Sequence, residues 1–220
     1  MTLALIPLDE RPVNTRYPRM IAAIAGESVL IPPPHLLPTI RQPADRAGLA
    51  AWLESHAASL DTLIVSVETF GYGGLIASRI TDEPALAVVQ ALDVLRQVKQ
   101  RHPHLRLIAF NVITRIPDAD YHFEEPLYWG QHGRALHRYS QLMHRASLGQ
   151  DVRDTLESLR AALPADVVAD FTHRRLRNHI VNLSMMEMLD TGVLDVLVIS
   201  SDDTSEYGFG SHEKTWLNVW

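Results

Sequence analysis

Two adjacent carboxylates, Asp202 and Asp203, follow the apolar run 196–199 near the end of the chain. This run, Val-Leu-Val-Ile, is typical of a parallel strand that is buried on both faces. Ligands of open α/β sheets bind at the carboxyl ends of such strands. Neighbouring side chains alternate between faces within a strand, but beyond its end both carboxylates can point into one site. Paired carboxylates there could do acid/base work on a glycosidic or similar bond, or bind a divalent cation through oxygen ligands.

Three earlier apolar runs also end in polar residues. The sequence Asp9-Glu10-Arg11 follows the first run, Glu68 follows the third, and Asn111 with Arg115 ends the fourth. Because the carboxyl ends of parallel strands meet at one edge of a sheet, we expect these groups to converge with the aspartate pair. The candidate catalytic residues are Asp9, Glu68, Asp202 and Asp203. The side chains expected to bind substrate are Glu10, Arg11, Asn14, Tyr72, Arg79, Asn111, Arg115, Thr204 and Tyr207.

Several of these residues also have a structural interpretation. Asn14 is suited to cap a helix, and Asp203 with Thr204 could cap the helix that follows them. Arg11 could clamp an anionic substrate group or form an ion pair within the protein. A partly buried Glu68 could act as a general acid. The segment 124–129 combines carboxylates with aromatic rings, which could stack on a sugar face or anchor a loop to the core.

Motifs for several other chemistries are absent from the sequence. It contains no G-x-G-x-x-G, no G-x-x-x-x-G-K-[ST], no G-x-S-x-G, no H-E-x-x-H and no cysteine. We therefore predict no cofactor. A divalent cation is the one optional group, and its ligands would be Asp9, Asp202 and Asp203.

Strand and helix patterns alternate through the first half of the chain. Apolar runs predict strands at 3–8, 29–31, 63–67 and 105–113, with helices between them. From 117 to 192 only helical patterns occur, at about 133–148, 152–163 and 164–189, before a last strand at 193–200. This order predicts an α/β fold with a mainly parallel sheet of about five strands flanked by helices, a Rossmann-like layer with a helical excursion before its last strand. The alternative is part of a (β/α)₈ barrel, which needs about 250 residues.

The composition is that of a globular protein. Of the 220 residues 46% are apolar and 21% charged, with a net charge of −6, which predicts a single α/β domain over 1–220 with a helical insertion at about 117–192. No cluster of Lys or Arg stands out, so we expect neither nucleic acid nor a membrane as partner. The expected partner is a small-molecule substrate, together with a second copy of the chain or a missing carboxyl-terminal portion. A start without signal-peptide character and the lack of cysteine favour a cytoplasmic location.

Three segments resemble a bacterial family known as domain of unknown function 4127. They are residues 7–14 (PLDERPVN), 72–79 (YGGLIASR) and 202–208 (DDTSEYG), which together span nearly the whole chain. Glu10 stands where the family often has aspartate, and the substitution keeps the carboxylate. Family members are usually about twice this length, which implies that the chain is an amino-terminal portion. The helical spacing of Trp216, Leu217 and Trp220 at its end points the same way. The resemblance implies no activity.

The residues lead to three functional hypotheses. The first is a hydrolase of a small polar, carbohydrate-like substrate, in which the Asp202–Asp203 pair supplies acid/base or orienting carboxylates. The second is a divalent-metal-dependent enzyme of phosphate esters. The third is a non-catalytic module whose arginines bind a small anion.

Overall fold

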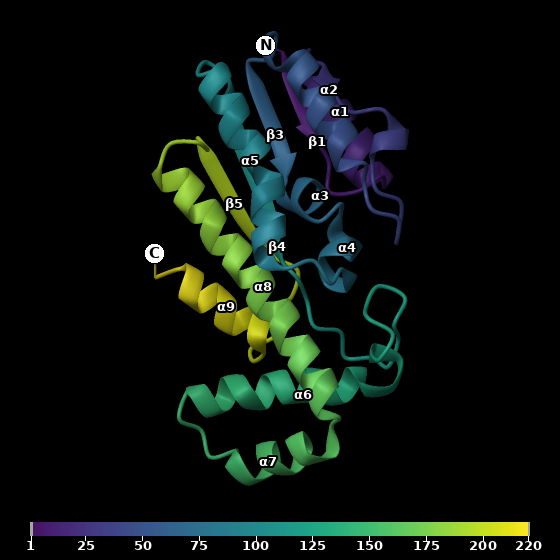
Figure 1. Ribbon diagram of the computed structural model, residues 1–220, viewed down its shortest axis with the longest axis vertical. Coiled ribbons are helices and arrows are strands. Elements are labelled where there is room, and N and C mark those ends of the chain that lie inside the picture. Colours follow the sequence, from purple (N-terminus) through teal and green to yellow (C-terminus); the bar gives the residue numbers. More distant parts are fainter. Residues whose placement is uncertain (1, 220) are drawn as a thin grey trace. The chain divides into compact units, whose positions relative to one another are not determined.

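Within residues 2–219, which the computed structural model describes, five strands form one sheet (Figure 1). The strands are β1 (Leu3–Ile6), β2 (Val29–Leu30), β3 (Thr62–Ser66), β4 (Arg106–Ile113) and β5 (Val196–Ser201), in the order β2-β1-β3-β4-β5. Residue pairing makes β2, β1, β3 and β4 parallel to one another. The amides of Asp195 and Asp202 donate to the carbonyls of Leu107 and Ile113, so β5 also runs parallel to β4. The predicted parallel α/β fold is confirmed, in one of the common orders of doubly wound sheets.

The described chain forms two compact units. Unit 1 comprises Met1–Asn111 and Val181–Ile199, and unit 2 comprises Val112–Ile180 and Ser200–Trp220. The division falls inside β4, β5 and the long helix α8 (Ala165–Asp190). Among residues 2–219, none of the helices combines the length and the apolar character that a membrane crossing requires.

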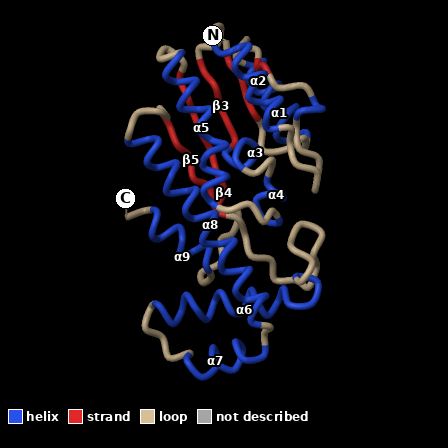
Figure 2. The backbone as a smooth tube through the Cα atoms, in the orientation of Figure 1, coloured by secondary structure: helices blue, strands red, loops and turns tan. Residues whose placement is uncertain are grey.

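Unit 1 holds most of the sheet and the helices that follow its strands, drawn in red and blue in Figure 2. They are α1 (Pro12–Ile24), the 3₁₀ turn η1 (Pro34–Leu36), α2 (Arg46–Ala57), α3 (Val67–Gly71), α4 (Leu75–Ile80) and α5 (Ala85–Arg101). The predicted apolar faces of α2 and α5 are buried in one core with strand residues and with α8. In α2, α5 and α8 the fully buried residues of this core are Leu49, Leu53, Ala57, Val88, Leu92, Leu95, Val98, Val181, Met185 and Met188.

The connection after β3 contains the two short helices α3 and α4, where the sequence analysis expects only a glycine-rich turn. Gly73 and Gly74 between them have φ angles of 91° and 134°. A Cβ on Gly73 would lie 2.7 Å from that of Pro43, and one on Gly74 would lie 2.9 Å from that of Pro38. These glycines are therefore required by a sharp turn that packs against prolines.

The ends of β1 and β3 are joined through Thr69 of α3. Its buried hydroxyl lies 2.6 Å from the carbonyl of Pro7 and 3.1 Å from that of Leu8. The α3 helix is itself started by Ser66, whose hydroxyl accepts a hydrogen bond from the amide of Thr69 at 3.3 Å. One threonine thus fixes the segment that leaves β1 against the segment that leaves β3.

Unit 2 is helical, as the sequence predicts. It contains α6 (Trp129–Ser147), α7 (Arg153–Ala162), the first part of α8 and α9 (Phe209–Leu217). Its own hydrophobic core is formed by Ile116, Trp129, Leu136, Tyr139, Leu163, Val167, Val168 and Phe171. At the end of the chain Leu217 is buried and Trp216 is exposed, whereas Trp220, predicted in the same helical pattern, lies outside the described residues.

A buried arginine of α8 holds three segments of unit 2 together. Arg175 donates from Nε and Nη2 to the two carboxylate oxygens of Glu213 in α9, at 2.8 and 2.6 Å. Its Nη1 donates to the carbonyl and hydroxyl oxygens of Thr114, just after β4, at 2.7 and 2.8 Å. The side chains of Arg175 and Glu213 are only 9% and 12% exposed. Neither residue is indicated by a motif in the sequence.

Replacing Thr69 by valine should lower the free energy of unfolding by about 1–3 kcal/mol, the usual cost of leaving buried polar groups without a hydrogen bond. Valine keeps the shape of threonine but cannot donate to the two carbonyls. Urea unfolding at pH 7 measures the change. The control is Thr215→Val, because Thr215 is exposed and bonds only within α9. Equal stability of both variants would contradict the linking role of Thr69.

Replacing Glu213 by glutamine should cost unit 2 about 3 kcal/mol or more, because the Arg175 charge then stays buried without its counter-charge. Urea unfolding followed by tryptophan fluorescence measures the loss. Glu206→Gln is the matched control at an exposed position. If the two substitutions cost the same, the ion pair does not hold unit 2 together.

Candidate functional site

The predicted site residues are divided between the two units. Unit 1 contains Asp9, Glu10, Arg11, Asn14, Glu68, Tyr72, Arg79 and Asn111, and unit 2 contains Arg115, Asp202, Asp203, Thr204 and Tyr207. Each set is described within its own unit. The convergence of all four strand ends on one site stays a prediction.

In unit 1, Asp9 organises the start of α1. Its Oδ1 accepts hydrogen bonds from the amide of Arg11 at 3.0 Å and from Nδ2 of Asn14 at 2.7 Å. Its Oδ2 accepts from Nε of Arg11 at 2.8 Å and forms an ion pair with Nη2 at 2.6 Å. Asn14 is not the N-cap that the sequence suggests, because α1 begins at Pro12 and Asn14 lies inside the helix. Arg11 therefore forms an ion pair within the protein, one of the two roles that the sequence allows for it.

The electrostatics of Asp9 agree with this role. Burial raises the pKa of the Asp9 carboxyl, but the hydrogen bonds and the charge of Arg11, with the hydrogen bond of Asn14, outweigh burial and hold the pKa below its ordinary value. Asp9 is therefore an ionised carboxylate whose two oxygens are both engaged inside unit 1.

The other predicted residues of unit 1 are mostly buried. Glu68 in α3 accepts a hydrogen bond from the hydroxyl of Ser66 at 3.1 Å, and Asn111 donates to Asn182 at 2.5 Å. Tyr72 belongs to the hydrophobic core. Arg79 is buried in α4, and Glu10 accepts from the amide of Ile40 at 3.2 Å.

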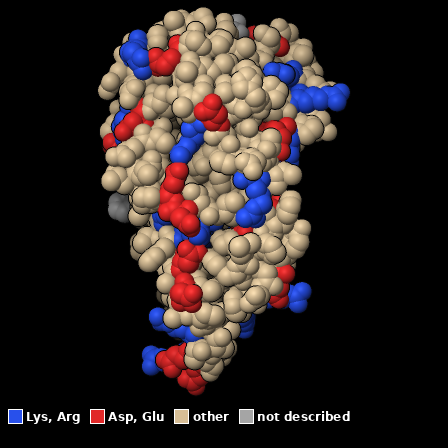
Figure 3. Space-filling model, turned by 45° about the vertical axis from the view of Figure 1, so that its right-hand side comes forward, with Lys and Arg blue, Asp and Glu red and all other residues tan. Residues whose placement is uncertain are grey.

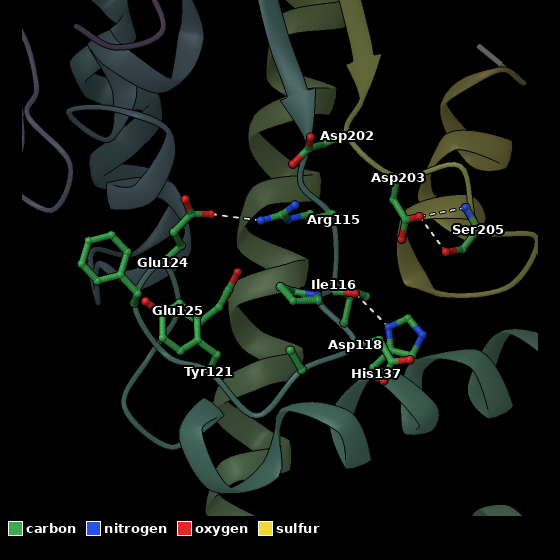
Figure 4. A pocket seen from close by; sticks show the side chains of 13 residues that line it. Arg115, Ile116, Asp118, Tyr121, Glu124, Glu125, His137, Asp202, Asp203 and Ser205 are labelled. Carbon is green, nitrogen blue, oxygen red and sulfur yellow. Dashed lines mark hydrogen bonds and ion pairs between the residues drawn. The ribbon is translucent and has the colours of Figure 1, made fainter. Parts of the chain in front are cut away.

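In unit 2 a cavity of about 480 Å³ brings three predicted residues together, namely Arg115, Asp202 and Asp203 (Figure 4). We call this cavity the acidic pocket. The segment after β4, α6 and the segment after β5 also contribute residues that the sequence analysis did not assign to the site. The chemically relevant ones are Asp118, Tyr121, Phe123, Glu124, Glu125, His137 and Ser205. Of these, Glu124 and Glu125 belong to the segment 124–129, which combines carboxylates with aromatic rings in the sequence.

Asp203 is held in one orientation. Its Oδ1 accepts hydrogen bonds from the amide and the hydroxyl of Ser205, at 2.8 and 2.6 Å, as Figure 4 shows. This is a local turn and not a helix cap, because α9 begins only at Phe209. The structural alternative in which Asp203 and Thr204 cap the next helix is therefore wrong. The neighbouring Asp202 is exposed, and its backbone amide is fixed to the carbonyl of Ile113 at 3.1 Å.

The opposite wall of the acidic pocket is the segment after β4. Arg115 forms an ion pair with Glu124 at 3.2 Å, and both side chains are partly exposed. His137 of α6 lies with Nδ1 2.8 Å from the carbonyl of Ile116, so it donates from Nδ1 and anchors this segment. Both contacts are drawn as dashed lines in Figure 4.

Two aromatic rings on this wall stack on each other and stay exposed. Tyr121 and Phe123 have ring centroids 6.2 Å apart and an interplanar angle of 24°. They are 64% and 45% exposed and belong to neither hydrophobic core. Trp129, from the segment noted in the sequence, is instead buried against Phe171 and anchors α6.

Thr204 and Tyr207 do not line the acidic pocket. The Tyr207 hydroxyl accepts from Gln150 at 3.3 Å, and Arg145 lies 5.5 Å from the ring centroid. Beside it, His144 stacks on His212 with centroids 4.9 Å apart, and its Nδ1 accepts from the amide of Gly208 at 3.2 Å. Tyr207 therefore fixes the chain that leads into α9.

Two further observations concern the surface charge and the candidate metal ligands. On the face in Figure 3, acidic and basic side chains are interspersed without a continuous basic patch. Among residues 2–219, no three His, Asp or Glu side chains are grouped so that they could hold a metal ion.

The sequence was compared with known proteins. The model of DUF4127, described as a protein of unknown function, matches residues 3–220. The comparisons with curated proteins and with solved structures gave no match.

Unit 2 should lose stability below about pH 6.5. Burial and the facing His212 lower the pKa of His144, so the unfolded chain binds this proton more readily than the folded chain. The stabilising contribution of neutral His144 is complete above its ordinary pKa of 6.5 and is lost as the pH falls. Urea unfolding at pH 7.5 and 5.5 should show this loss in the wild type.

The same measurement on His144→Asn should show a weaker pH dependence, because asparagine can accept from Gly208 without titrating. His173→Asn, at an exposed position of α8, is the control and should behave like the wild type. An unchanged pH dependence in His144→Asn would refute the assignment.

Proposed function

The chain belongs to the DUF4127 family of proteins of unknown function, and we propose that it hydrolyses a small, carbohydrate-like substrate in the acidic pocket of unit 2. One observation carries the proposal: Asp202 and Asp203 line the same cavity as an exposed, stacked aromatic pair. Carboxylates that act on a glycosidic bond, beside rings that receive a sugar face, are the parts that such a reaction needs. The volume of about 480 Å³ is that of an ordinary small-molecule site.

Asp203 serves as the carboxylate that activates water. The two hydrogen bonds of Ser205 occupy Oδ1, and no residue between 2 and 219 forms a hydrogen bond or ion pair with Oδ2. A carboxylate that is fixed in this way can take a proton from a water molecule as that water attacks the sugar carbon. The water oxygen forms the new bond to carbon.

Asp202 serves as the acid. It gives a proton to the oxygen of the leaving group as the glycosidic bond breaks, so that the second product departs as a neutral alcohol. The amide of Asp202 is anchored to β4 while its side chain remains exposed, which supports a group that must meet substrate from solvent. After the reaction Asp203 carries the proton that it took from water, and Asp202 lacks the proton that it gave to the leaving group. Transfer of one proton from Asp203 to Asp202 restores the starting state.

The charge balance favours this reaction over the two alternatives. Five carboxyl side chains line the acidic pocket, those of Asp118, Glu124, Glu125, Asp202 and Asp203, whereas Arg115 is its only lysine or arginine. Such a lining repels phosphate esters and small anions. Asp9, predicted as a further catalytic carboxylate, receives a structural role in this proposal because Arg11 and Asn14 engage both of its oxygens.

Replacing either Asp202 or Asp203 by asparagine should reduce hydrolysis of the best substrate in a panel of aryl glycosides by about 10²-fold or more. Asparagine keeps the size of the side chain but can neither donate the acid proton nor accept one from water. Release of the aryl alcohol gives kcat and KM for each variant. Asp151→Asn, at an exposed position before α7, is the control and should keep full activity. Full activity in both site variants, or no hydrolysis of any glycoside by the wild type, would refute the proposal.

A further inference from the structure

We infer that the acidic pocket selects a substrate with a positive charge, namely a sugar that carries a free amino group. The inference deepens the proposed function and rests on it for the sugar part of the ligand. Two independent features of the pocket support it: the carboxylates of Asp118 and Asp203, and the exposed aromatic pair.

Two carboxylates of the acidic pocket, those of Asp118 and Asp203, form no ion pair with a lysine or arginine among residues 2–219. Arg115, the only lysine or arginine among the lining residues, is already paired with Glu124 at 3.2 Å. No residue between 2 and 219 forms a hydrogen bond or ion pair with the side chain of Asp118, and none does so with Oδ2 of Asp203. Like charges that share a cavity repel one another, and an ammonium group placed between them removes this repulsion.

The aromatic pair points to the same kind of ligand by a different route. Tyr121 and Phe123 are stacked on each other, and both rings are exposed to solvent and lie outside both hydrophobic cores. The face of an aromatic ring carries partial negative charge and attracts cations, and it also packs against the C–H face of a sugar. A neutral sugar would use only the second property, whereas an amino sugar would use both.

The pocket is lined by two segments that are separate in sequence. Asp118 and the aromatic pair belong to the segment after β4, and Asp203 belongs to the segment after β5. Figure 4 shows Asp118, Tyr121 and Asp203 around the pocket. A ligand whose ring lies on the aromatic pair and whose ammonium group reaches Oδ2 of Asp203 would contact both walls, and Asp118 offers a second carboxylate on the wall of the aromatic pair. The amino group therefore provides orientation as well as affinity.

Isothermal titration calorimetry with four methyl glycosides tests the inference. The ligands are the methyl glycosides of glucosamine, N-acetylglucosamine, glucose and glucuronic acid. Binding is measured at pH 6.5, where an amine with the pKa of an α-amino group, about 7.7, is mostly protonated. The glucosaminide should bind at least about tenfold more tightly than the N-acetylated and the neutral sugar, and the glucuronide should bind weakest. Raising the salt concentration should reduce the preference.

Variants locate the source of the preference. In Asp118→Asn and in Asp203→Asn the advantage of the glucosaminide over the N-acetylated sugar should shrink several-fold. Asp151→Asn should keep it. Asp118 is exposed and its side chain forms no hydrogen bond or ion pair among residues 2–219, so its variant tests the idea even if Asp203→Asn fails to fold. A preference that is unchanged in Asp118→Asn and in any folded Asp203→Asn would overturn the inference, as would equal binding of the charged and neutral sugars by the wild type.

The outcome also separates this inference from the proposed function. Hydrolysis of glycosides without preference for an amino group would overturn the inference and leave the hydrolase intact. Selective binding of the glucosaminide without any turnover would support the charge selectivity and refute the hydrolase.

Discussion

The architecture of unit 2 depends on one buried cation. Arg175 projects from α8, and its guanidinium group uses both edges, one on the carboxylate of Glu213 and the other on Thr114. Thr114 opens the segment that carries Arg115, Asp118 and the aromatic pair, while α9 closes the segment that carries Asp202 and Asp203. A planar group with five donors can hold these segments in one geometry, which a lysine could not do. Arg175 thus connects the two segments that carry the walls of the acidic pocket.

This support explains how unit 2 can keep several carboxylates close together. Like charges that lie close together repel one another and favour the unfolded chain. Contacts within each wall of the acidic pocket oppose this repulsion. Ser205 fixes Asp203, Arg115 pairs with Glu124, and His137 anchors the backbone at Ile116. The side chain of Asp118 and Oδ2 of Asp203 also line the cavity, where a ligand can contact them.

The sheet could be predicted because its strands are nearly continuous apolar runs. The helices of unit 2 could be predicted because their apolar residues recur at helical spacing. The short helix α3 was missed because five residues are too few for a period to be recognised, although Ser66 is an ordinary cap. Asp202, Asp203 and Arg115 were found by their position at strand ends. Asp118 and Tyr121 lie in an irregular loop, where no repeat indicates which side chains share a face.

The role of Arg175 could not be predicted from the sequence. It stands in the stretch 174–177 of a long helix, where nothing in the residue pattern distinguishes it from the neighbouring Arg174 and Arg177. Only burial and the contacts with Thr114 and Glu213 reveal its role. The division between the two units was likewise invisible, because it falls inside β4, β5 and α8, which are each continuous in sequence.

The central claim is that the acidic pocket of unit 2 is the ligand site. The most direct test is a nuclear magnetic resonance titration with methyl glucosaminide, in which the backbone amide shifts are assigned and followed. The account predicts saturable shifts centred on Asp118, Tyr121, Asp203 and Ser205, with little change around Asp9. Shifts centred on unit 1, or none at concentrations of tens of millimolar, would contradict it.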